Sequence, residues 1–535
     1  MQQISCIFLS VFLLFIFKKN TNASYMKKNV FSSAILLSFG GIICKFMGAV
    51  YKIPLANILG AEGIGIYQLA YPLYAFLLVF VSGGIPYSLS CFVAKARAEG
   101  KQNKTAGYFY SAFLYSFALG ICFALFMICF SKVLANFQGN ALAWQSYVGF
   151  GLSILFSCLI PCFRGLFQGY ENYIPTFVSQ ILEQLAKLVL GLFFSYVLAK
   201  RSLQLGVFGA SLGVLAGELI AFFYLLVCFL SNKKKYIFEN TIYKNDAKKF
   251  FKFFVGIMLA SIITPFLNVY QSFVVIPVLE SLNFTKNFAT SVYGIQTGMI
   301  NPITNFPLVF SSALAIVLMP NLGYLFSKNK EKAKQMLCKS LKSVFVLSIP
   351  CMIGLFVLAK PILSLVFSSL DQNMMDIAQN FLKISAFSIL FMVLSQVCTI
   401  ALQGAIVQWK AFWCMFVFAV FYVILLPIFL ALFGIYGFAL CSVLCYGFLA
   451  TTEIFFLKKI YMIKLDFKTL VVPFVASIFM GLLTNFIYKL LYTFSNVLAV
   501  FVCILIAILF YFLALFIFGI ITKKELLFFV KKTTK

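Results

Sequence analysis

Repeated apolar runs, each about 20 residues long, restrict the fold of this chain more than any other feature of its sequence. A helix of that length crosses the hydrocarbon core of a membrane, which is about 30 Å thick. The runs are continuous rather than alternating in polarity, which excludes a transmembrane β-barrel. Only 10% of the residues are charged, against about a quarter in a soluble domain. The sequence therefore predicts an all-α, polytopic membrane protein.

Hydropathy predicts about 14 transmembrane helices, and the positive charges orient them. Lys and Arg gather in alternate connections, so an even number of spans with both termini cytoplasmic fits the sequence. These basic connections lie near residues 95–104, 233–252, 328–342 and 458–468 and in the tail at 531–535. The net charge of +28 is thus mainly a topology signal in a cell-membrane protein, and we expect no nucleic-acid partner.

The first 25 residues do not fit this pattern. Their apolar run "ISCIFLSVFLLFIF" is followed by Lys18 and Lys19, whereas a secretory signal carries its basic residues first. The stretch "MKKN" at Met26 is a suitable cytoplasmic start for the next span. We interpret residues 1–25 as an extension or as a mis-assigned start.

Two parts of the chain resemble each other in the same order. "LFQGYENYIPTFVS" from Leu166 resembles "ALQGAIVQWKAFWC" from Ala401, and "GVFGASLGVL" from Gly206 resembles "GIYGFALCSVL" from Gly434, at nearly the same offset. A repeat of six spans predicts two parallel six-helix lobes around a central cavity, as in an alternating-access carrier. The predicted division is an N-lobe at 26–232, a cytoplasmic linker at 233–250, a C-lobe at 251–458, and two further helices with a basic tail at 459–535.

Charged residues inside the predicted spans are costly in lipid and often functional. Lys45 and Lys52 lie in the first span with no acidic neighbour, Lys45 toward its outer end; each either faces a cavity or extends its amine to the membrane surface. Glu183 and Lys187 are one turn apart and form either a fixed internal pair or part of a coupling site. Glu218 is either buried and neutral or a second coupling group. Because unpaired lysines prevail, the substrate is expected to be anionic.

Other polar residues allow two interpretations each. Arg164 begins a predicted cytoplasmic connection, where it either orients the span or meets an anionic substrate. Asn268, Gln271 and Asn301, with Gln296 and Asn305, either line the cavity or bond across helices. Lys360 and Lys383 near span ends are interpreted as anchors.

The residue types also exclude several chemistries. The sequence holds no histidine, and its 15 cysteines are scattered through apolar runs, so we expect neither a metal site nor a cofactor. No P-loop motif occurs, so an ion gradient or the membrane potential is the expected energy source. A membrane glycosyltransferase would need catalytic acids, and the only outer pair is Asp371 with Asp376. We therefore expect a transporter rather than an enzyme.

Three stretches resemble a known family. "FSSAILLSFGGIICKFMGAVYKIPLANILGAEGIGIYQLAYPLYAF", "RGLFQGYENYIPTFVSQILEQLAKL" and "SVYGIQTGMINPITNFPLVFSSALAIVLMPNL" are similar to the stage V sporulation protein B group. This group is the Gram-positive polysaccharide-biosynthesis branch of the MOP exporter superfamily, which also contains the lipid II flippases and the MATE multidrug exporters. The resemblance runs from about Met26 through the twelfth span.

The resemblance implies a monomeric flippase for an undecaprenyl-pyrophosphate-linked cell-wall precursor, with lipid II or a related polysaccharide unit as substrate. It places Lys45 where lipid II flippases carry a cavity arginine for the pyrophosphate, and Tyr51 at the second such position, with Lys52 beside it. Arg164 would join these cations. The charged cluster that the family carries in span seven is absent from "MLASIITPFLNVYQSFVV". The alternative is a MATE-like exporter of drugs or cations.

Overall fold

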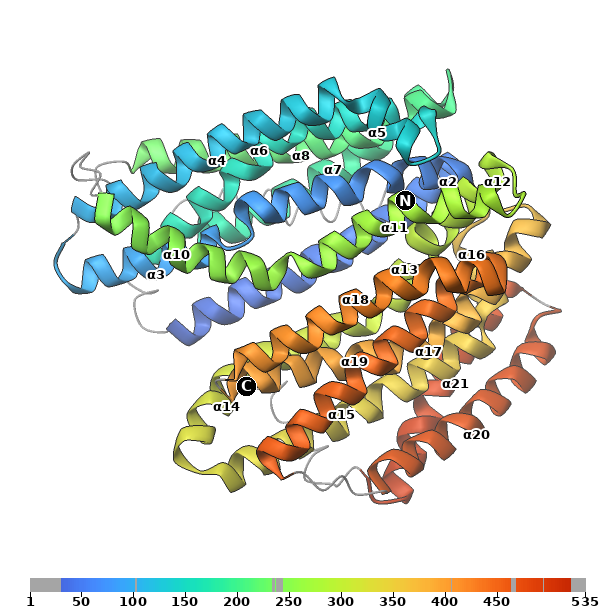
Figure 1. Ribbon diagram of the computed structural model, residues 1–535. Coiled ribbons are helices and arrows are strands. Elements are labelled where there is room, and N and C mark those ends of the chain that lie inside the picture. The colour runs from blue at the N-terminus through green and yellow to red at the C-terminus, as the bar shows by residue number, and fades with distance from the viewer. Residues whose placement is uncertain are drawn as a thin grey trace.

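The computed structural model describes residues 30–101, 103–232, 236, 244–405, 407–462, 468–493 and 495–520. Every regular element in these ranges is a helix, and the predicted all-α fold is confirmed. The N-terminal extension, the end of the basic tail and most of the predicted linker lie outside the described residues. Figure 1 shows the helices gathered in two lobes, one above the other, with their axes along a common direction.

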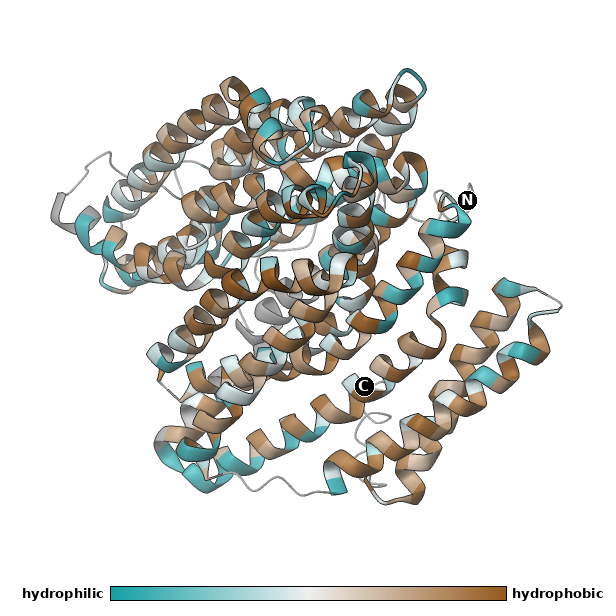
Figure 2. Ribbon diagram, turned by 45° about the vertical axis from the view of Figure 1, so that its right-hand side comes forward, coloured by the Kyte–Doolittle hydropathy of each residue, from teal (hydrophilic) through white to brown (hydrophobic). Residues whose placement is uncertain are grey.

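Eleven of the described helical segments are long and apolar enough to cross a membrane. Figure 2 shows hydrophobic residues along the helices and hydrophilic residues concentrated toward their ends. The protein is therefore a multi-pass membrane protein. The predicted count of 14 transmembrane helices stays a prediction, because a broken segment can hold more than one span. Two of the eleven segments contain such a break, Ile43–Ala98 at Gly60 and Trp409–Tyr461 at Gly434, and both glycines have positive φ.

The first lobe begins with a long broken helix. In α2 (Val30–Ser82), Gly60 has φ 68° and ψ −175°, which only glycine adopts readily. Figure 1 shows α2 running to the end of the molecule where α12 lies and then turning back. The lobe continues with α3 (Ile85–Ala98), α4 (Asn103–Cys129), α5 (Ser131–Phe137), η2 (Ala141–Ala143), α6 (Trp144–Gly169), α7 (Ile174–Ala199) and α8 (Leu203–Ser231).

Glycines bring α7 and α8 into direct backbone contact. A Cβ atom at Gly213 of α8 would lie 2.1 Å from the Cα of Gly191 in α7, and one at Gly217 would lie 2.7 Å from the carbonyl oxygen of Glu183. Small residues permit such close approach between membrane helices, where dispersion rather than the hydrophobic effect drives association. This contact fixes the stretch of α7 that carries Glu183 and Lys187.

The chain passes to the second lobe through α10 (Lys244–Ser261), α11 (Ile263–Ser281), α12 (Lys286–Gly294), a π-helical turn η3 (Ile295–Ile300) and α13 (Asn301–Thr304). The ring of Phe250 in α10 packs on Phe92 of α3, and Phe251 packs on Tyr115 of α4. The first half of the predicted seventh span therefore lies against the first lobe. In its first half, α11 (Ile263–Ser281) also contacts α18, where Tyr270 Oη donates to the carbonyl oxygen of Val423 at 2.7 Å.

The second lobe consists of α14 (Phe306–Lys328), α15 (Lys330–Val357), α16 (Ala359–Val366), α17 (Gln372–Gly404), α18 (Gln408–Phe433), η4 (Gly434–Tyr436), α19 (Gly437–Tyr461), α20 (Lys468–Leu491) and α21 (Asn496–Ile517). The last two helices lie at the outer edge of the lobe (Figure 1). They pack on α15, where Tyr511 Oη donates to the carbonyl oxygen of Val346 at 2.8 Å.

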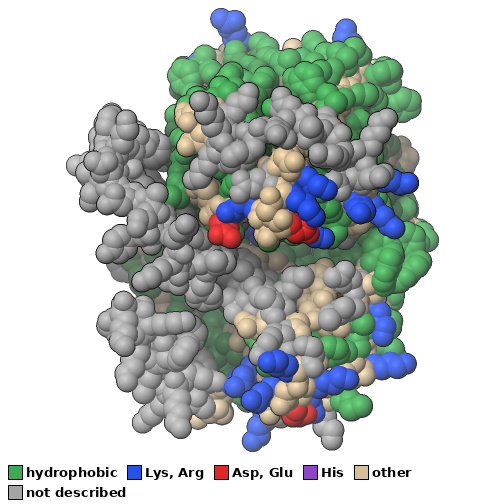
Figure 3. Space-filling model, turned by 90° about the vertical axis from the view of Figure 1, so that its left-hand side faces the viewer, with side chains coloured by type: hydrophobic (Ala, Val, Ile, Leu, Met, Phe, Trp, Pro, Cys, Tyr) green, Lys and Arg blue, Asp and Glu red, His purple; other side chains and the backbone are tan. Residues whose placement is uncertain are grey.

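The two ends of the molecule differ in charge. We call the end that carries Lys95, Arg97, Lys328 and Lys458 the basic end. Figure 3 looks onto it and shows Lys and Arg side chains on both lobes with few acidic ones among them. The opposite end, at Gly60, is called the Gly60 end. The positive-inside rule is the physical basis for taking the basic end as the cytoplasmic one, and this orientation stays a prediction.

Candidate functional site

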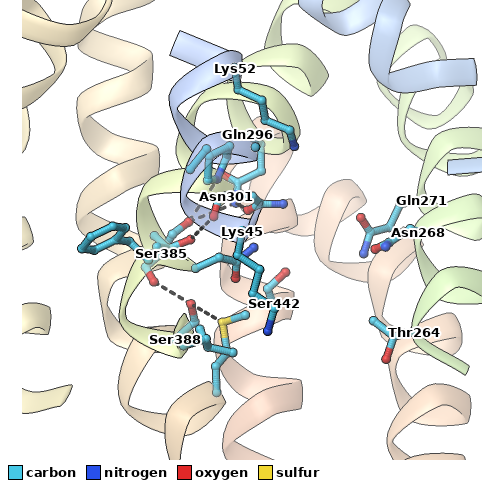
Figure 4. A pocket seen from close by; sticks show the side chains of 18 of the residues that line it. Lys45, Lys52, Thr264, Asn268, Gln271, Gln296, Asn301, Ser385, Ser388 and Ser442 are labelled. Atoms are coloured by element: carbon cyan, nitrogen blue, oxygen red, sulfur yellow. Dashed lines mark hydrogen bonds between the residues drawn. The ribbon is translucent and has the colours of Figure 1, made fainter. Parts of the chain in front are cut away.

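A cavity of about 580 Å³ lies between the two lobes. Residues of α2 and α7 form its wall on the first lobe, and residues of α11, η3, α13, α14, α17, α18 and α19 form the rest. Figure 4 shows Lys45 and Lys52 one above the other on α2, with Thr264, Asn268 and Gln271 on a helix across the cavity. The predicted central cavity is thus present in the fold.

Three lysines line the cavity: Lys45 and Lys52 from the first arm of α2, and Lys187 from α7. Lys45 and Lys52 are two helical turns apart, which puts them on one face of the helix. Lys45 is exposed, whereas Lys52 and Lys187 are half-buried. No Asp or Glu is among the lining residues that the structure describes. The wall of the first lobe is therefore cationic.

Lys45 lies well inside the first arm of α2. The arm extends to Gly60, 15 residues beyond Lys45, which is about 22 Å at 1.5 Å per residue. A lysine side chain is too short to reach water at that end of the arm. Its exposure in the cavity is what keeps this charge hydrated, and its depth in the membrane stays a prediction.

The opposite wall is uncharged and rich in amides and hydroxyls. The predicted residues Asn268, Gln271 and Asn301 all line the cavity. The amide nitrogen of Gln271 donates to Tyr422 Oη at 3.0 Å, and that of Gln296 donates to Asn301 Oδ1 at 3.2 Å and to Ser385 Oγ at 3.1 Å. The bond from Gln296 to Ser385 (Figure 4) joins the π-helical turn to α17. One wall is therefore suited to an anion and the other to neutral polar groups.

Behind the cationic wall, Glu183 is held by an arginine. Its Oε2 accepts from Arg164 Nη2 at 2.9 Å, and its Oε1 accepts from Gln184 Nε2 at 3.0 Å and lies 3.9 Å from Lys187 Nζ. Arg164 Nε also donates to Ser179 Oγ at 3.0 Å. The predicted pair of Glu183 with Lys187 exists, but Arg164 makes the closer contact. Of the two cations at Glu183, Lys187 is the one that lines the cavity.

Arg164 does not belong to the cavity wall. It lies inside α6, its side chain is 15% exposed, and it is absent from the lining residues. The prediction that it begins a cytoplasmic connection is wrong, because α6 continues to Gly169. Its charge is already compensated by Glu183 at 2.9 Å, whereas Lys187 lines the cavity.

Glu218 of α8 is 5% exposed and lies apart from the cavity lining. Its Oε1 accepts from Tyr74 Oη at 3.2 Å, and Tyr74 Oη also lies 2.7 Å from Ser157 Oγ. Tyr74 comes from the second arm of α2, the helix whose first arm carries the cavity lysines. Glu218 is therefore hydrogen-bonded to α2, and Lys187 and Arg164 lie close enough to interact with its charge.

The lobes are in contact at the Gly60 end. A Cβ at Gly65 would lie 2.1 Å from the carbonyl oxygen of Thr290, and one at Gly294 would lie 2.3 Å from the carbonyl oxygen of Ala61. Asn140 Nδ2 donates to Thr290 Oγ1 at 2.9 Å. Further bonds there join Gln68 to Thr297, Gln138 to Ser272 and Asn57 to Val366. This contact closes the cavity toward the Gly60 end.

The variant Gly65→Ala is expected to weaken that closure. The added methyl overlaps the Thr290 carbonyl group, and overpacking costs about 1–3 kcal/mol, which shifts a two-state equilibrium about 5- to 150-fold toward the open form. Hydrogen exchange followed by mass spectrometry should show faster exchange of the amides at 286–300. Gly323→Ala is the matched control, because its Cβ would meet only the carbonyl oxygen of Gly404 at 3.5 Å. Equal exchange in both variants would contradict this account of the closure.

Several residues were missed in the sequence. The polar stripe Ser385, Ser388 and Gln396 has helical spacing within one apolar run, a signal that was readable. Tyr51 was not missed: the resemblance placed it at the second cavity-arginine position, and it lines the cavity, with its hydroxyl group buried and without a hydrogen-bond partner among the described residues. Glu453 of α19, which lies close to the basic end, was also missed.

The chain matches the family model described as polysaccharide biosynthesis protein over residues 30–326, and the MatE model over residues 257–428. It is 25% identical over 303 residues to stage V sporulation protein B of Bacillus subtilis, covering 56% of this chain but only 58% of that relative. It is 22% identical over 375 residues to the lipid II flippase MurJ of the same organism, covering 64% of this chain and 67% of the relative.

Solved structures share the fold. A lipid II flippase MurJ in an inward closed conformation superposes with a TM-score of 0.70 at 19% identity, covering 90% of this chain and 98% of that one. An inward-facing MATE family transporter of the MOP superfamily gives 0.64 at 14% identity, covering 80% and 99%. At these identities the likeness concerns the fold alone.

Proposed function

The chain belongs to the polysaccharide biosynthesis protein family of the MOP superfamily. From this premise we propose that it moves a polyprenyl-pyrophosphate-linked saccharide from the cytoplasmic to the outer leaflet of the membrane. The observation that carries the proposal is the cavity between the lobes, lined by Lys45, Lys52 and Lys187 and by no described acidic residue. The stage V sporulation and lipid II flippase relatives support it. We take undecaprenyl as the prenyl chain and lipid II or a related unit as the cargo.

The main barrier to such transport is the headgroup. A pyrophosphate with its sugars must cross about 30 Å of hydrocarbon, and an ionised group without a partner is prohibitively costly there. A hydrated cavity with three ammonium groups offers that anion charge-assisted hydrogen bonds. The amides of Asn268, Gln271 and Asn301 offer the sugars neutral partners on the facing wall. The prenyl chain needs no such site, because it remains soluble in lipid.

The closed contact at the Gly60 end supports alternating access. With the basic end on the cytoplasmic side, the headgroup enters the cavity from the cytoplasm and leaves after Gly65 and Thr290 separate. Lysine presents a point charge without the rigid fork of arginine. It therefore attracts a diphosphate without imposing a fixed geometry, which suits a cargo that must also leave.

For energy we propose an ion gradient or the membrane potential rather than ATP, since no P-loop motif occurs in the sequence. Of the two predicted coupling acids, Glu218 is the better suited, because Glu183 already bonds to Arg164 at 2.9 Å. Glu218 instead bonds to Tyr74 of α2, so a change in its charge would act on the helix that carries the cavity lysines.

The rival function is export of drugs or cations, which the MatE match at 257–428 favours. Three lysines in the cavity oppose it, because like charges in a low-dielectric site repel strongly.

An enzymatic role has less support. In the predicted acidic pair, Asp376 is exposed and bonds to Lys360 at 3.0 Å, and Asp371 is exposed. We propose that the protein acts as a monomer.

The test uses full-length protein in liposomes that contain undecaprenyl-pyrophosphoryl-N-acetylglucosamine with a nitrobenzoxadiazole label on the sugar. Dithionite added outside destroys the fluorescence of outer-leaflet label only, so transport appears as loss of the protected inner fraction. We expect that loss with the pyrophosphate lipid and not with labelled phosphatidylcholine. Efflux of ethidium without movement of the pyrophosphate lipid would replace this proposal by the rival one.

A further inference from the structure

The second lobe contains a buried carboxyl group that the proposed function does not use. Glu453 of α19 has no solvent-exposed surface. Its Oε1 accepts a short hydrogen bond from Thr399 Oγ1 of α17, and its Oε2 is buried with no hydrogen-bond partner among the described residues. A carboxyl group without a neighbouring cation is costly to ionise inside a membrane protein. Such a group is therefore taken as functional by default.

The surroundings of Glu453 are apolar. The titratable groups that face it from the helices packed on α19 are thiols, Cys398 of α17 and Cys414 of α18. The buried hydrophobic residues nearest to Glu453 and Thr399 along the two helices, Ala450 and Leu457 on α19 and Ala401 and Leu402 on α17, belong to the hydrophobic core of the second lobe. The closest lysines along the chain, Lys458 and Lys459, are exposed at the basic end.

These neighbours do not suit a metal ion. One carboxyl group and one hydroxyl group are far from the six or more oxygen ligands of a hard divalent cation. No cluster of three or more His, Cys, Asp or Glu residues occurs in the part of the chain that the structure describes. A proton needs a single oxygen and makes the group neutral, so it is the ligand that this site can hold.

Glu453 lies at the end of a polar stripe that starts in the cavity. On α17, Ser385, Ser388 and Gln396 line the cavity, and Thr399 follows one turn after Gln396 on the same face. On α19, Ser442 and Tyr446 line the cavity, and Glu453 follows two turns later. Thr399 is half-buried, whereas Glu453 is fully buried. Glu453 precedes Lys458 by about 7.5 Å along α19.

We propose that Glu453 is a proton-binding site of the second lobe, which holds a proton in the conformation described and exchanges it with the cavity along the stripe that ends at Thr399. The site goes beyond the proposed function, because it requires no particular cargo. When the lobes separate at the Gly60 end, the cavity end of the stripe faces the outer side.

Infrared spectroscopy of the full-length protein in lipid nanodiscs tests this without any substrate. We expect the wild-type protein at neutral pH to show the carbonyl band of a protonated carboxylic acid, with a component that disappears in Glu453→Gln. The control Glu331→Gln removes an exposed acid at the same end of the lobe and should leave the band unchanged. Thr399→Val should shift the component to higher wavenumber, because the carbonyl group loses its hydrogen bond.

If Glu453→Gln does not fold, Glu453→Asp serves instead and should move the component without removing it. Identical spectra for wild-type protein, Glu453→Gln and Glu331→Gln would overturn the proposal, since Glu453 would then be ionised. A component that disappears in Glu453→Gln but is unmoved by Thr399→Val would overturn the route through Thr399. Neither result depends on whether the protein moves a pyrophosphate lipid, so the failure of one proposal is distinguishable from the failure of the other.

Discussion

Replacing Lys45 by alanine is expected to lower the initial rate of pyrophosphate-lipid transport about 10- to 100-fold, with the protein still folded. The side chain of Lys45 is exposed and lines the cavity, and a hydrogen bond to a charged group contributes about 1.5–3 kcal/mol. The Lys45 amine is solvated in the cavity, so its removal does not leave a buried carboxylate without a counter-ion. The stability of the protein should therefore change little. The dithionite assay in liposomes measures the rate, and size-exclusion chromatography checks the fold.

Two matched variants separate charge from position. Lys45→Arg keeps the cation and should retain most of the activity, whereas Lys458→Ala removes an exposed lysine at the basic end and should have no effect. Lys52→Ala should have a smaller effect than Lys45→Ala, because Lys52 is half-buried. Normal transport by Lys45→Ala would mean that the cavity charge is carried by Lys52 and Lys187 alone.

The class of the protein could be predicted from the sequence because it depends on local signals. Span length, loop charge and the first-span motif are all properties of neighbouring residues, and they led to the membrane fold and to Lys45 and Lys52 as cavity residues. The cavity positions of Asn268, Gln271 and Asn301 could be predicted for the same reason. Polar side chains within apolar spans tend to face the interior of the bundle.

Pairing across helices could not be predicted in this way. Lys187 lies one turn from Glu183 along the sequence, so it was the natural partner, but a salt bridge is decided by distance in space. Arg164 on α6 approaches Glu183 to 2.9 Å because α6, α7 and α8 pack together. The glycines of α8 that allow this packing are visible in the sequence, whereas the helix that they contact is not.

Glu453 was missed for a different reason. It stands five residues before Lys458 and so reads as part of the charged end of a span. Only the tertiary structure reveals that Glu453 is fully buried and accepts a hydrogen bond from Thr399 of another helix. Depth along the helix alone does not distinguish a buried acid from a surface one near a membrane boundary.

The variant Arg164→Met is expected to be the most destabilising single change in the first lobe. Arg164 and Glu183 are 15% and 13% exposed and bond at 2.9 Å. Removing one partner of a buried ion pair costs about 3–5 kcal/mol, because the other charge is left without compensation. The apparent melting temperature of the purified protein in detergent should fall clearly below that of the wild-type protein.

The double variant Arg164→Met/Glu183→Gln should recover most of that loss, because a neutral amide replaces the uncompensated carboxylate while the shape is kept. Lys187→Met is the comparison, and it should destabilise far less, since its amine lies 3.9 Å from Glu183 and faces the cavity. The two variants should also differ in transport: Lys187→Met removes a cavity cation and should slow the pyrophosphate lipid, whereas the double variant keeps all three cavity lysines. If the double variant melts as low as Arg164→Met, the arginine stabilises the lobe through Ser179 and its packing rather than through Glu183, and the charge network does not hold α7 in place.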